Sequence, residues 1–298
     1  MQQQGTLVTS GPKPRENQEA TRRAPVGAAT RRSVNPLDRL LARYGPWAVV
    51  TGASDGIGRA MARELAASGL NLILCARRRD VLDPLGAELS AEFGVEARVV
   101  DADLADPAGV EKLLAATEAF EVGLLVAAAG FGTSGPFLDN PLDEELGMLD
   151  VNCRAVTALA HHFGTRFSAQ RRGGLVLLSS LLAFQGVARA AHYAATKAYV
   201  QSLAEGLRAE LRPFGVDVVA SAPGPIRSGF AARAGMTMAS AGTPESVARE
   251  TLRALGRSGT VRPGFLSKFL ELSLSFLPRR GRVFVLSRVM AGMTERTS

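Results

Sequence analysis

Six short apolar runs alternate along the chain with segments whose apolar residues recur at helical spacing. The runs cover residues 46–51, 71–76, 97–101, 122–127, 174–179 and 215–221. They are continuously apolar rather than alternating, which is typical of strands buried on both faces of a parallel sheet. The pattern therefore predicts an α/β fold with one doubly wound parallel sheet and helices on both faces.

The two ends of the chain differ from this regular middle. Residues 1–33 are rich in Gln, Gly, Thr, Pro and Arg without apolar periodicity, so we expect a disordered basic tail. A short helix is predicted from Asn35 to Tyr44, with Asn35 as its N-cap and Pro36 in its first turn. We place the catalytic domain at residues 34–260 and a basic, partly amphipathic, helical C-terminal extension at residues 261–298.

Charge is distributed unevenly. The 298-residue chain has a net charge of +7. Residues 1–45 carry +5 and residues 249–298 carry +7, which leaves −5 on the stretch between them. Because the basic character belongs to the ends, we expect no nucleic-acid partner for the domain.

The apolar stretch 264–277 is followed by three arginines and allows two interpretations. It suits peripheral contact with an anionic membrane surface, and it equally suits a helix that caps a substrate pocket, which we favour. Polar residues interrupt the stretch and Pro278 ends it, so it is not a spanning helix. Residues 1–33 contain no apolar h-region, so we do not expect them to be a secretory signal, and a transit peptide is the alternative. The two cysteines, Cys75 and Cys153, form no disulfide framework or metal pattern, and we expect a reducing, cytoplasmic setting.

Tyr193 and Lys197 carry the most informative chemistry. They stand at positions i and i+4, so on a helix they share one face. A fixed ammonium a few ångströms away favours the phenolate, which makes a tyrosine usable as an acid and base. Ser180, thirteen residues before the tyrosine, follows an apolar run and could hold a carbonyl oxygen for protonation. Without other motifs, a solvated helix face would explain the pair as well.

A glycine-rich turn follows the first apolar run. Gly52, Gly56 and Gly58 stand between that run and a helical pattern, which is the strand–turn–helix context of dinucleotide binding. Gly52 would permit a tight turn, Gly56 a close approach to a pyrophosphate, and Gly58 close packing of helix on strand. The helix N-terminus would offer amide donors to phosphate groups. A glycine-rich turn alone could also be an ordinary tight turn.

Taken together and in this order, the motifs from about Tyr44 to about Thr260 resemble the short-chain dehydrogenase/reductase family, with its Rossmann-like fold. The sequence Tyr44-Gly45-Pro46-Trp47 resembles the branch with 17β-hydroxysteroid dehydrogenases and 3-oxoacyl-CoA reductases. The resemblance implies a catalytic set of Asn152, Ser180, Tyr193 and Lys197. Its implied cofactor contacts, together with those read from the residues, are Gly52, Ser54, Asp55, Gly56, Ile57, Gly58, Arg77, Arg78, Asp103, Ala129, Gly130, Tyr193, Lys197, Pro223, Gly224, Ile226 and Ser228.

The implied roles are specific. Tyr193 would exchange a proton with the substrate oxygen, Lys197 would lower the tyrosine pKa and hold the nicotinamide ribose, and Ser180 would orient the carbonyl. Asn152 would support a relay water. One departure is that Ala127 and Ala128 stand where the family usually has two asparagines. The family's asparagines help tie the central strands together, so we expect some loss of stability here.

The residues after the second apolar run indicate the cofactor. Ala76 stands where an acidic residue would bind the ribose 2′-hydroxyl of NAD, and Arg77, Arg78 and Arg79 follow. A guanidinium suits a phosphate dianion, so we predict NADP(H), with Arg77 as the main contact and Arg78 as its helper. The alternative is a solvated run of charge at a helix start.

These observations predict an NADP(H)-dependent oxidoreductase that transfers hydride between nicotinamide and a carbonyl or secondary alcohol. The branch resemblance favours a hydrophobic ketone, an oxosteroid or a 3-oxoacyl thioester. The loop 228–243 is rich in Ala, Gly and Met, which suits a lid over an apolar ligand. Small carbonyls or 3-hydroxy acids are an alternative, as is a catalytically silent NADP-binding regulator. The resemblance also implies a homodimer or homotetramer formed through the helices that hold Asn152 and Tyr193.

Overall fold

Seven parallel strands form the centre of the molecule in a computed structural model that describes residues 38–227, 229, 242–264, 267–268, 273–274 and 276–294. Their order in the sheet is β3-β2-β1-β4-β5-β6-β7. The strands are β1 (Trp47–Thr51), β2 (Asn71–Ala76), β3 (Ala97–Asp101), β4 (Val122–Ala127), β5 (Gly173–Leu178), β6 (Val216–Ser221) and β7 (Thr260–Val261). The predicted doubly wound parallel sheet is confirmed, because the order reverses between β1 and β4.

Burial explains why the six runs become strands. Every residue of β1, β4 and β5 is buried, as expected for central strands with helices on both faces. Strand β3 at the sheet edge is mostly half-exposed and carries the charged Arg98. All six predicted runs match strands to within one residue at each end. The two-residue strand β7 was not predicted, since so short a segment has no readable period.

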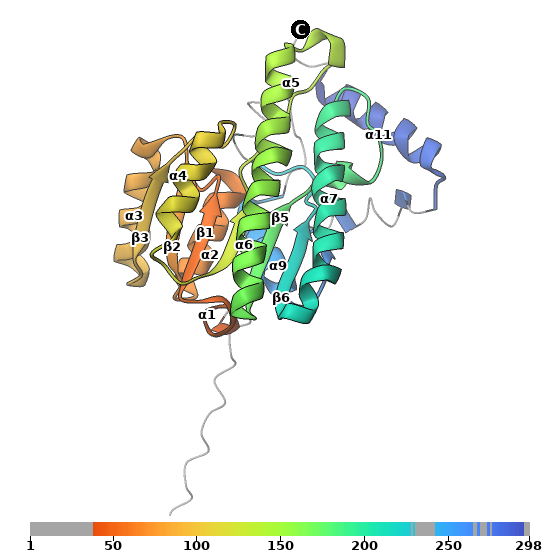
Figure 1. The fold of residues 1–298 in the computed structure, drawn as a ribbon. Helices are drawn as coiled ribbons and strands as arrows, with labels where there is room; N and C mark the ends of the chain where they lie inside the picture. The colour runs from red at the N-terminus through yellow and green to blue at the C-terminus, as the bar shows by residue number, and fades with distance from the viewer. Residues whose placement is uncertain are drawn as a thin grey trace, which may run out of the picture. The chain divides into compact units, whose positions relative to one another are not determined.

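Helices cover both faces of the sheet (Figure 1). One apolar cluster includes residues of α1, α2, α3 and α9, and the other includes residues of α4, α6 and α7. Strand β1 alternates between them, because Ala48 and Val50 belong to the first cluster and Trp47 and Val49 to the second. The helices are α1 (Asp38–Tyr44), α2 (Gly56–Ala67), α3 (Arg79–Phe93), α4 (Pro107–Thr117), α5 (Leu142–Leu149), α6 (Val156–Gln170), α7 (Ala191–Leu211), α9 (Pro244–Ala254) and α11 (Arg279–Thr294).

Short helical turns connect several of these elements. The π-helical turn η2 (Asp150–Ala155) joins α5 to α6, which together form the long helix at the centre of Figure 1. The 3₁₀ turns are η1 (Phe137–Asp139), η3 (Leu181–Phe184) and η4 (Arg212–Phe214). A π-helical turn inside an α-helix often marks a functional site, and this one contains Asn152.

Several expectations concern segments outside the described residues. The tail 1–33, Asn35, Pro36 and Ser228 lie there, as do most of the loop 228–243 and half of the stretch 264–277. The short predicted helix is present from Asp38 to Tyr44. The expected C-terminal helical extension is also present, as α11. Within the described ranges, no helix combines the length and apolar character needed to cross a bilayer.

The side chain of Thr51 joins the first and fourth strands where the usual asparagines are missing. Its hydroxyl oxygen accepts hydrogen bonds from the backbone N–H groups of Ala128 and Ala129, each at 3.1 Å. The hydroxyl donates to the carbonyl of Val126 at 3.4 Å. Thr51 is itself buried. The two N–H groups that follow β4 therefore have a partner, although the asparagine side chains are absent.

We expect Thr51→Val to destabilise the protein by about 2–4 kcal/mol, because it leaves two N–H groups at the end of β4 without their acceptor. Urea unfolding followed by circular dichroism would measure the loss. Thr51→Ser keeps the hydroxyl and should stay within about 1 kcal/mol of the wild type. Equal stability of the valine variant and the wild type would show that the hydroxyl does not join the strands.

Candidate active site

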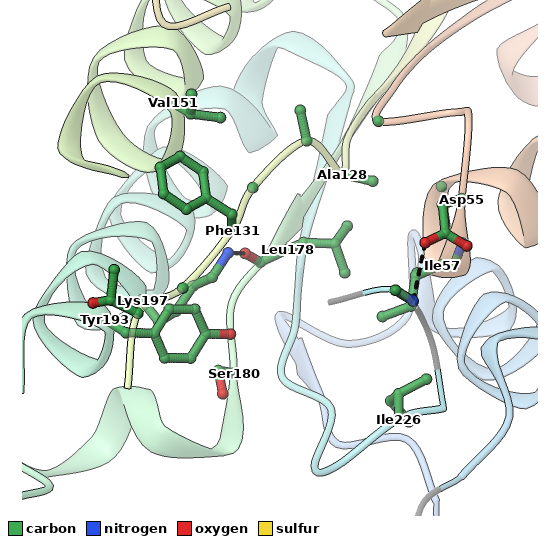
Figure 2. Close-up of a pocket in the computed structure, with 18 of the residues that line it drawn as sticks. Asp55, Ile57, Ala128, Phe131, Val151, Leu178, Ser180, Tyr193, Lys197 and Ile226 are labelled. Atoms are coloured by element: carbon green, nitrogen blue, oxygen red, sulfur yellow. Dashed lines mark hydrogen bonds between the residues drawn. The ribbon is translucent and has the colours of Figure 1, made fainter. Parts of the chain in front are cut away.

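A cavity of about 940 Å³ lies where the strands end at their carboxyl termini. Its walls come from the turn 52–58 after β1, the segments after β2, β3, β4, β5 and β6, and residues of α7 and α11. The order of the strands reverses at this point between β1 and β4. Open α/β sheets bind their ligands in the crevice at such a switch point. In Figure 2, Tyr193, Lys197 and Ser180 lie on one side of the cavity, with Asp55, Ile57 and Ile226 on the other.

Two glycines of the glycine-rich turn stand where a side chain has no room. Gly52 has a left-handed φ of +66°, and a Cβ there would come within 2.8 Å of the Ala129 nitrogen. A Cβ on Gly58 would lie 2.3 Å from the Gly52 carbonyl oxygen. Asp55 caps helix α2 by accepting from the Gly56 N–H at 2.7 Å, and its other oxygen accepts from the Gly229 N–H at 3.0 Å. The turn therefore brings the start of α2 to the cavity, as the sequence predicted.

Tyr193 and Lys197 lie one turn apart on α7, and both are buried. The Lys197 Nζ atom donates to the Leu178 carbonyl at 2.8 Å, which fixes the ammonium at the end of β5. That atom lies 5.8 Å from the centroid of the Tyr193 ring. The solvated helix face that would otherwise explain this pair is excluded, because both side chains are buried.

Burial governs the pKa values of this pair. It raises the pKa of Tyr193 to about 12, against a smaller lowering effect from a hydrogen bond with Ser180. It lowers the pKa of Lys197 to about 8. The sequence led us to expect a lowered tyrosine pKa, and the structure differs because the phenol is removed from water. At neutral pH Tyr193 is consequently a proton donor beside a charged lysine.

Two neighbouring serines, Ser179 and Ser180, follow β5, and the structure gives them different partners. Ser180 is the N-cap of η3, where its Oγ accepts from the Leu182 N–H at 3.2 Å and bonds to Tyr193. Ser179 donates its hydroxyl to the Lys197 carbonyl at 3.1 Å, which fastens β5 to α7. Of the two hydroxyls, only that of Ser180 is paired with the phenol. Ser180 is therefore placed to act together with Tyr193, and its catalytic role stays a prediction.

Asn152 connects the segment after β4 to α7. Its Nδ2 donates to the Phe131 carbonyl at 2.9 Å and to Thr196 Oγ1 at 3.1 Å, and its Oδ1 accepts from the Phe131 N–H at 3.1 Å. A Cβ on Gly130 would approach Asn152 Oδ1 to 2.9 Å and Lys197 Nζ to 3.4 Å. The glycine is therefore required for this close contact, and the asparagine side chain has protein partners on both of its polar atoms.

Three arginines follow β2, and they divide into two groups. Arg77 and Arg78 line the cavity, and Arg77 is 3.9 Å from Asp103, with both side chains more than half exposed. Such an exposed pair is weak and leaves the guanidinium available. Arg79 instead lies 3.2 Å from Asp83 and 3.3 Å from Asp101. Only the first two arginines therefore line the cavity, and their contact with a cofactor stays a prediction.

The proline–glycine loop after β6 completes the wall beside the catalytic residues. Pro223, Gly224 and Ile226 line the cavity, and the Gly224 N–H donates to the buried Ser267 Oγ at 2.8 Å. Backbone hydrogen bonds join Arg227 and Pro225 to Gly242, at 3.1 and 2.9 Å. Ser228, the last predicted contact, lies outside the described residues.

Helix α11 forms a wall that sequence reasoning did not locate. Its apolar side chains line the cavity and are Leu286, Val289, Met290 and Met293. Leu286 and Met290 also pack against Val187, Ala190 and Ala194 near the start of α7. We expected the capping segment at residues 264–277, and the structure places a cavity wall on the next helix. The arginines in the first turn of α11 obscured its apolar face in the sequence.

Comparison with known proteins agrees with this geometry. A family model described as short chain dehydrogenase matches residues 46–238. A 7beta-hydroxysteroid dehydrogenase of Clostridium sardiniense is 31% identical over 230 residues, covering 76% of this chain and 88% of its own. A very-long-chain 3-oxoacyl-CoA reductase of Phaeosphaeria nodorum is 30% identical over 282 residues, covering 86% of this chain and 79% of its own.

A solved structure is also similar to this chain. The short-chain dehydrogenase from Sphingobium yanoikuyae in complex with NADPH superimposes with a TM-score of 0.70 at 29% identity, covering 80% of this chain and 94% of that chain. The family match covers the glycine-rich turn, the Tyr193–Lys197 pair and the proline–glycine loop, which the fold brings to one cavity. The chain therefore belongs to the short-chain dehydrogenase family of NAD(P)-dependent oxidoreductases.

Proposed function

We propose that the protein is an NADP(H)-dependent oxidoreductase that reduces a hydrophobic ketone, or oxidises the corresponding secondary alcohol. The observation that carries the proposal is the arrangement of Tyr193, Ser180 and Lys197 at a cavity whose wall beside them is apolar. The phenol supplies a proton, the serine an orienting hydroxyl, and the lysine a fixed charge. No metal ligand is needed for this chemistry.

The cavity suits a dinucleotide with a 2′-phosphate. The glycine-rich turn packs tightly, since Cβ atoms at Gly52 and Gly58 would collide with backbone, and it brings the N-terminus of α2 to the cavity, where backbone N–H groups suit a pyrophosphate. Arg77 and Arg78 are exposed at the cavity and suit a phosphate dianion. Asp103 lies in the same wall and would meet the adenine. When bound, NADPH supplies the hydride that the protein's own side chains cannot provide.

The proton chemistry follows from the pKa values. Tyr193 is protonated at neutral pH and donates its proton to the carbonyl oxygen as the substrate is reduced. The Ser180 hydroxyl holds the same oxygen, and the Lys197 ammonium stabilises the phenolate that forms. The polar atoms of Asn152's side chain are bonded to Phe131 and Thr196.

The apolar walls favour a bulky substrate. Phe131, Leu182, Leu286 and Met290 line the side of the cavity near the catalytic residues. The relatives described above are named for a hydroxysteroid and for a very-long-chain 3-oxoacyl-CoA. As the substrate we propose an oxosteroid or a similar rigid hydrophobic ketone, and we rank the 3-oxoacyl thioester second. Asp143 and Glu144 are the acidic residues on the α5 wall, and they disfavour the phosphates of coenzyme A.

Steady-state assays of NADPH oxidation test this proposal. The purified protein would be given oxosteroids, 3-oxoacyl-CoA thioesters and small ketones such as cyclohexanone. Turnover with the highest kcat/KM for oxosteroids supports the proposal as stated. Preference for small ketones would replace it with the small-carbonyl alternative. Tight NADPH binding without turnover of any member would favour the regulatory alternative.

The lowered pKa of Lys197 predicts a pH dependence. A lysine in water stays charged to about pH 10, whereas the buried Lys197 loses its charge above about pH 8. We expect kcat/KM for reduction to be constant from pH 6 to 7.5 and to fall roughly tenfold per unit above pH 8. Lys197→Arg keeps its charge throughout and should show no such fall. A wild-type profile that stays flat to pH 10 would contradict this assignment.

We further propose a homodimer or homotetramer assembled through α5, η2, α6 and α7. The exposed Leu142, Leu146 and Leu149 follow each other along one side of α5, as expected of a helix that packs on a partner. Peripheral membrane contact is the weaker proposal for the C-terminal region, because α11 places its apolar side chains on the cavity. We propose a cytoplasmic location with any membrane contact limited to this region.

A further inference from the structure

A buried polar network lies beside the cavity and has no part in the proton chemistry described above. Its centre is Glu145 on α5, whose side chain is only 2% exposed. One carboxylate oxygen accepts from Thr133 Oγ1 at 2.7 Å and from Asn140 Nδ2 at 2.8 Å. The other oxygen lies 2.7 Å from Nδ1 of His192. A carboxylate is rarely buried to this extent unless hydrogen bonds and charge partners compensate for its lost hydration.

Glu145 and His192 depend on each other. Among the described residues, both Glu145 Oε2 and His192 Nδ1 are buried without a hydrogen bond of good geometry, and the 2.7 Å ion-pair contact joins them to each other. So short a contact between an acceptor-only carboxylate oxygen and a ring nitrogen is favourable only with the ring proton on Nδ1, so we infer that Nδ1 carries it. The ring of His192 also meets the ring of Phe137 edge-on, with centroids 6.0 Å apart. Removing the imidazole would leave a buried carboxylate oxygen without a donor, which is costly.

The network connects the cavity wall to the catalytic helix. Thr133 and Asn140 belong to the segment 131–141 between β4 and α5, and Thr133 lines the cavity. His192 is in the first turn of α7, next to Tyr193. A backbone hydrogen bond from Gly135 to Arg189 at 3.0 Å joins the same two parts of the chain. Asn152 holds the beginning of the segment at Phe131, and Glu145 with His192 holds the remainder.

We propose that Glu145 and His192 act as a positioning pair that holds segment 131–141 against the start of α7 and thereby sets the substrate-binding wall beside Tyr193. The inference rests on the proposed function. The pair does not touch the reacting atoms, since Tyr193 is placed by its own helix and by Ser180. Its loss should weaken substrate binding and leave the chemical step and the distant Arg77–Arg78 end of the cavity nearly unchanged.

The test compares two substitutions of one residue. His192→Phe keeps a ring beside Phe137 but removes the donor, whereas His192→Asn replaces Nδ1 with an amide nitrogen that can donate to Glu145. We expect KM for the best ketone to rise about tenfold in the phenylalanine variant, with kcat changed less than about threefold. Amide hydrogen exchange in segment 131–141 should accelerate about tenfold or more. Both quantities should return to within about threefold of the wild type in the asparagine variant.

NADPH binding, followed by fluorescence titration, is the control and should be unchanged in both variants. Thr133→Val removes a hydrogen-bond donor at the cavity end of the network, so it tests the proposal if His192→Phe does not fold. We expect it to raise KM for the ketone and to accelerate amide hydrogen exchange in segment 131–141. The proposal is overturned if neither substitution changes KM or exchange, or if asparagine fails to rescue a phenylalanine variant that folds. Amide exchange needs no turnover, so it still tests the pair if the wild type reduces no ketone.

Discussion

Replacing Tyr193 with phenylalanine should lower kcat for ketone reduction by about 10³-fold, within the range that a positioned acid contributes. The phenol is the only group bonded to Ser180 that can supply a proton to a carbonyl oxygen, among the cavity residues that the structure describes. Phenylalanine fills the same buried space, so the fold and NADPH binding should be retained. Stopped-flow measurement of NADPH oxidation under single-turnover conditions would isolate the chemical step.

Tyr199→Phe is a matched control for this experiment. Tyr199 lies on the same helix, but its hydroxyl is bonded to Thr157 at 2.6 Å and its side chain is 43% exposed. Its loss should leave kcat within about twofold of the wild type. If the Tyr193 variant retained more than a tenth of the wild-type rate, another group would have to be the acid, and the proposed mechanism would be wrong.

Removing Arg77 and Arg78 together should raise KM for NADPH roughly 10- to 100-fold and leave KM for NADH nearly unchanged. The expected rise in KM for NADPH corresponds to the loss of charge-assisted hydrogen bonds to the 2′-phosphate. NADH lacks this phosphate, so its binding does not depend on those bonds. Parallel steady-state titrations of both cofactors with Arg77→Ala/Arg78→Ala would measure the difference. Both side chains are exposed at the cavity, so the substitutions should not disturb folding.

Arg79→Ala serves as the control for cofactor preference. Its guanidinium is occupied by Asp83 and Asp101, and its side chain is not among those that line the cavity. We expect an unchanged ratio of NADPH to NADH efficiency. If the wild-type enzyme had equal kcat/KM for NADH and NADPH, the cofactor assignment would be refuted whatever the results with the variants. Equal values would mean that the arginines do not recognise the 2′-phosphate.

The sheet could be predicted well because burial on both faces leaves a strong local signal. Runs such as 71–76 and 122–127 match their strands residue for residue. The glycines could also be predicted, because a turn that excludes Cβ atoms requires glycine at fixed spacing. The grouping of Tyr193, Lys197 and Ser180 was predictable because the helix period and the strand end place them together. These are consequences of short stretches of sequence.

Other features depend on contacts between distant segments and had no such signal. Glu145 looks in the sequence like one of three acidic residues in an exposed first turn, and only the fold shows that it is buried against His192. The role of Thr51 depends on two N–H groups more than 75 residues away. The raised pKa of Tyr193 likewise results from the removal of water by the assembled fold, which the spacing of Tyr193 and Lys197 does not reveal.

The contribution of α11 to the cavity has an evolutionary consequence. The family match ends at residue 238, whereas α11 adds four apolar side chains to the cavity from residues 286–293. Part of the substrate wall is thus encoded outside the segment that carries the proton chemistry, while Phe131 and Leu182 lie inside that segment. Mutations in the last fifty codons can therefore reshape this part of the wall without altering the residues that move the proton.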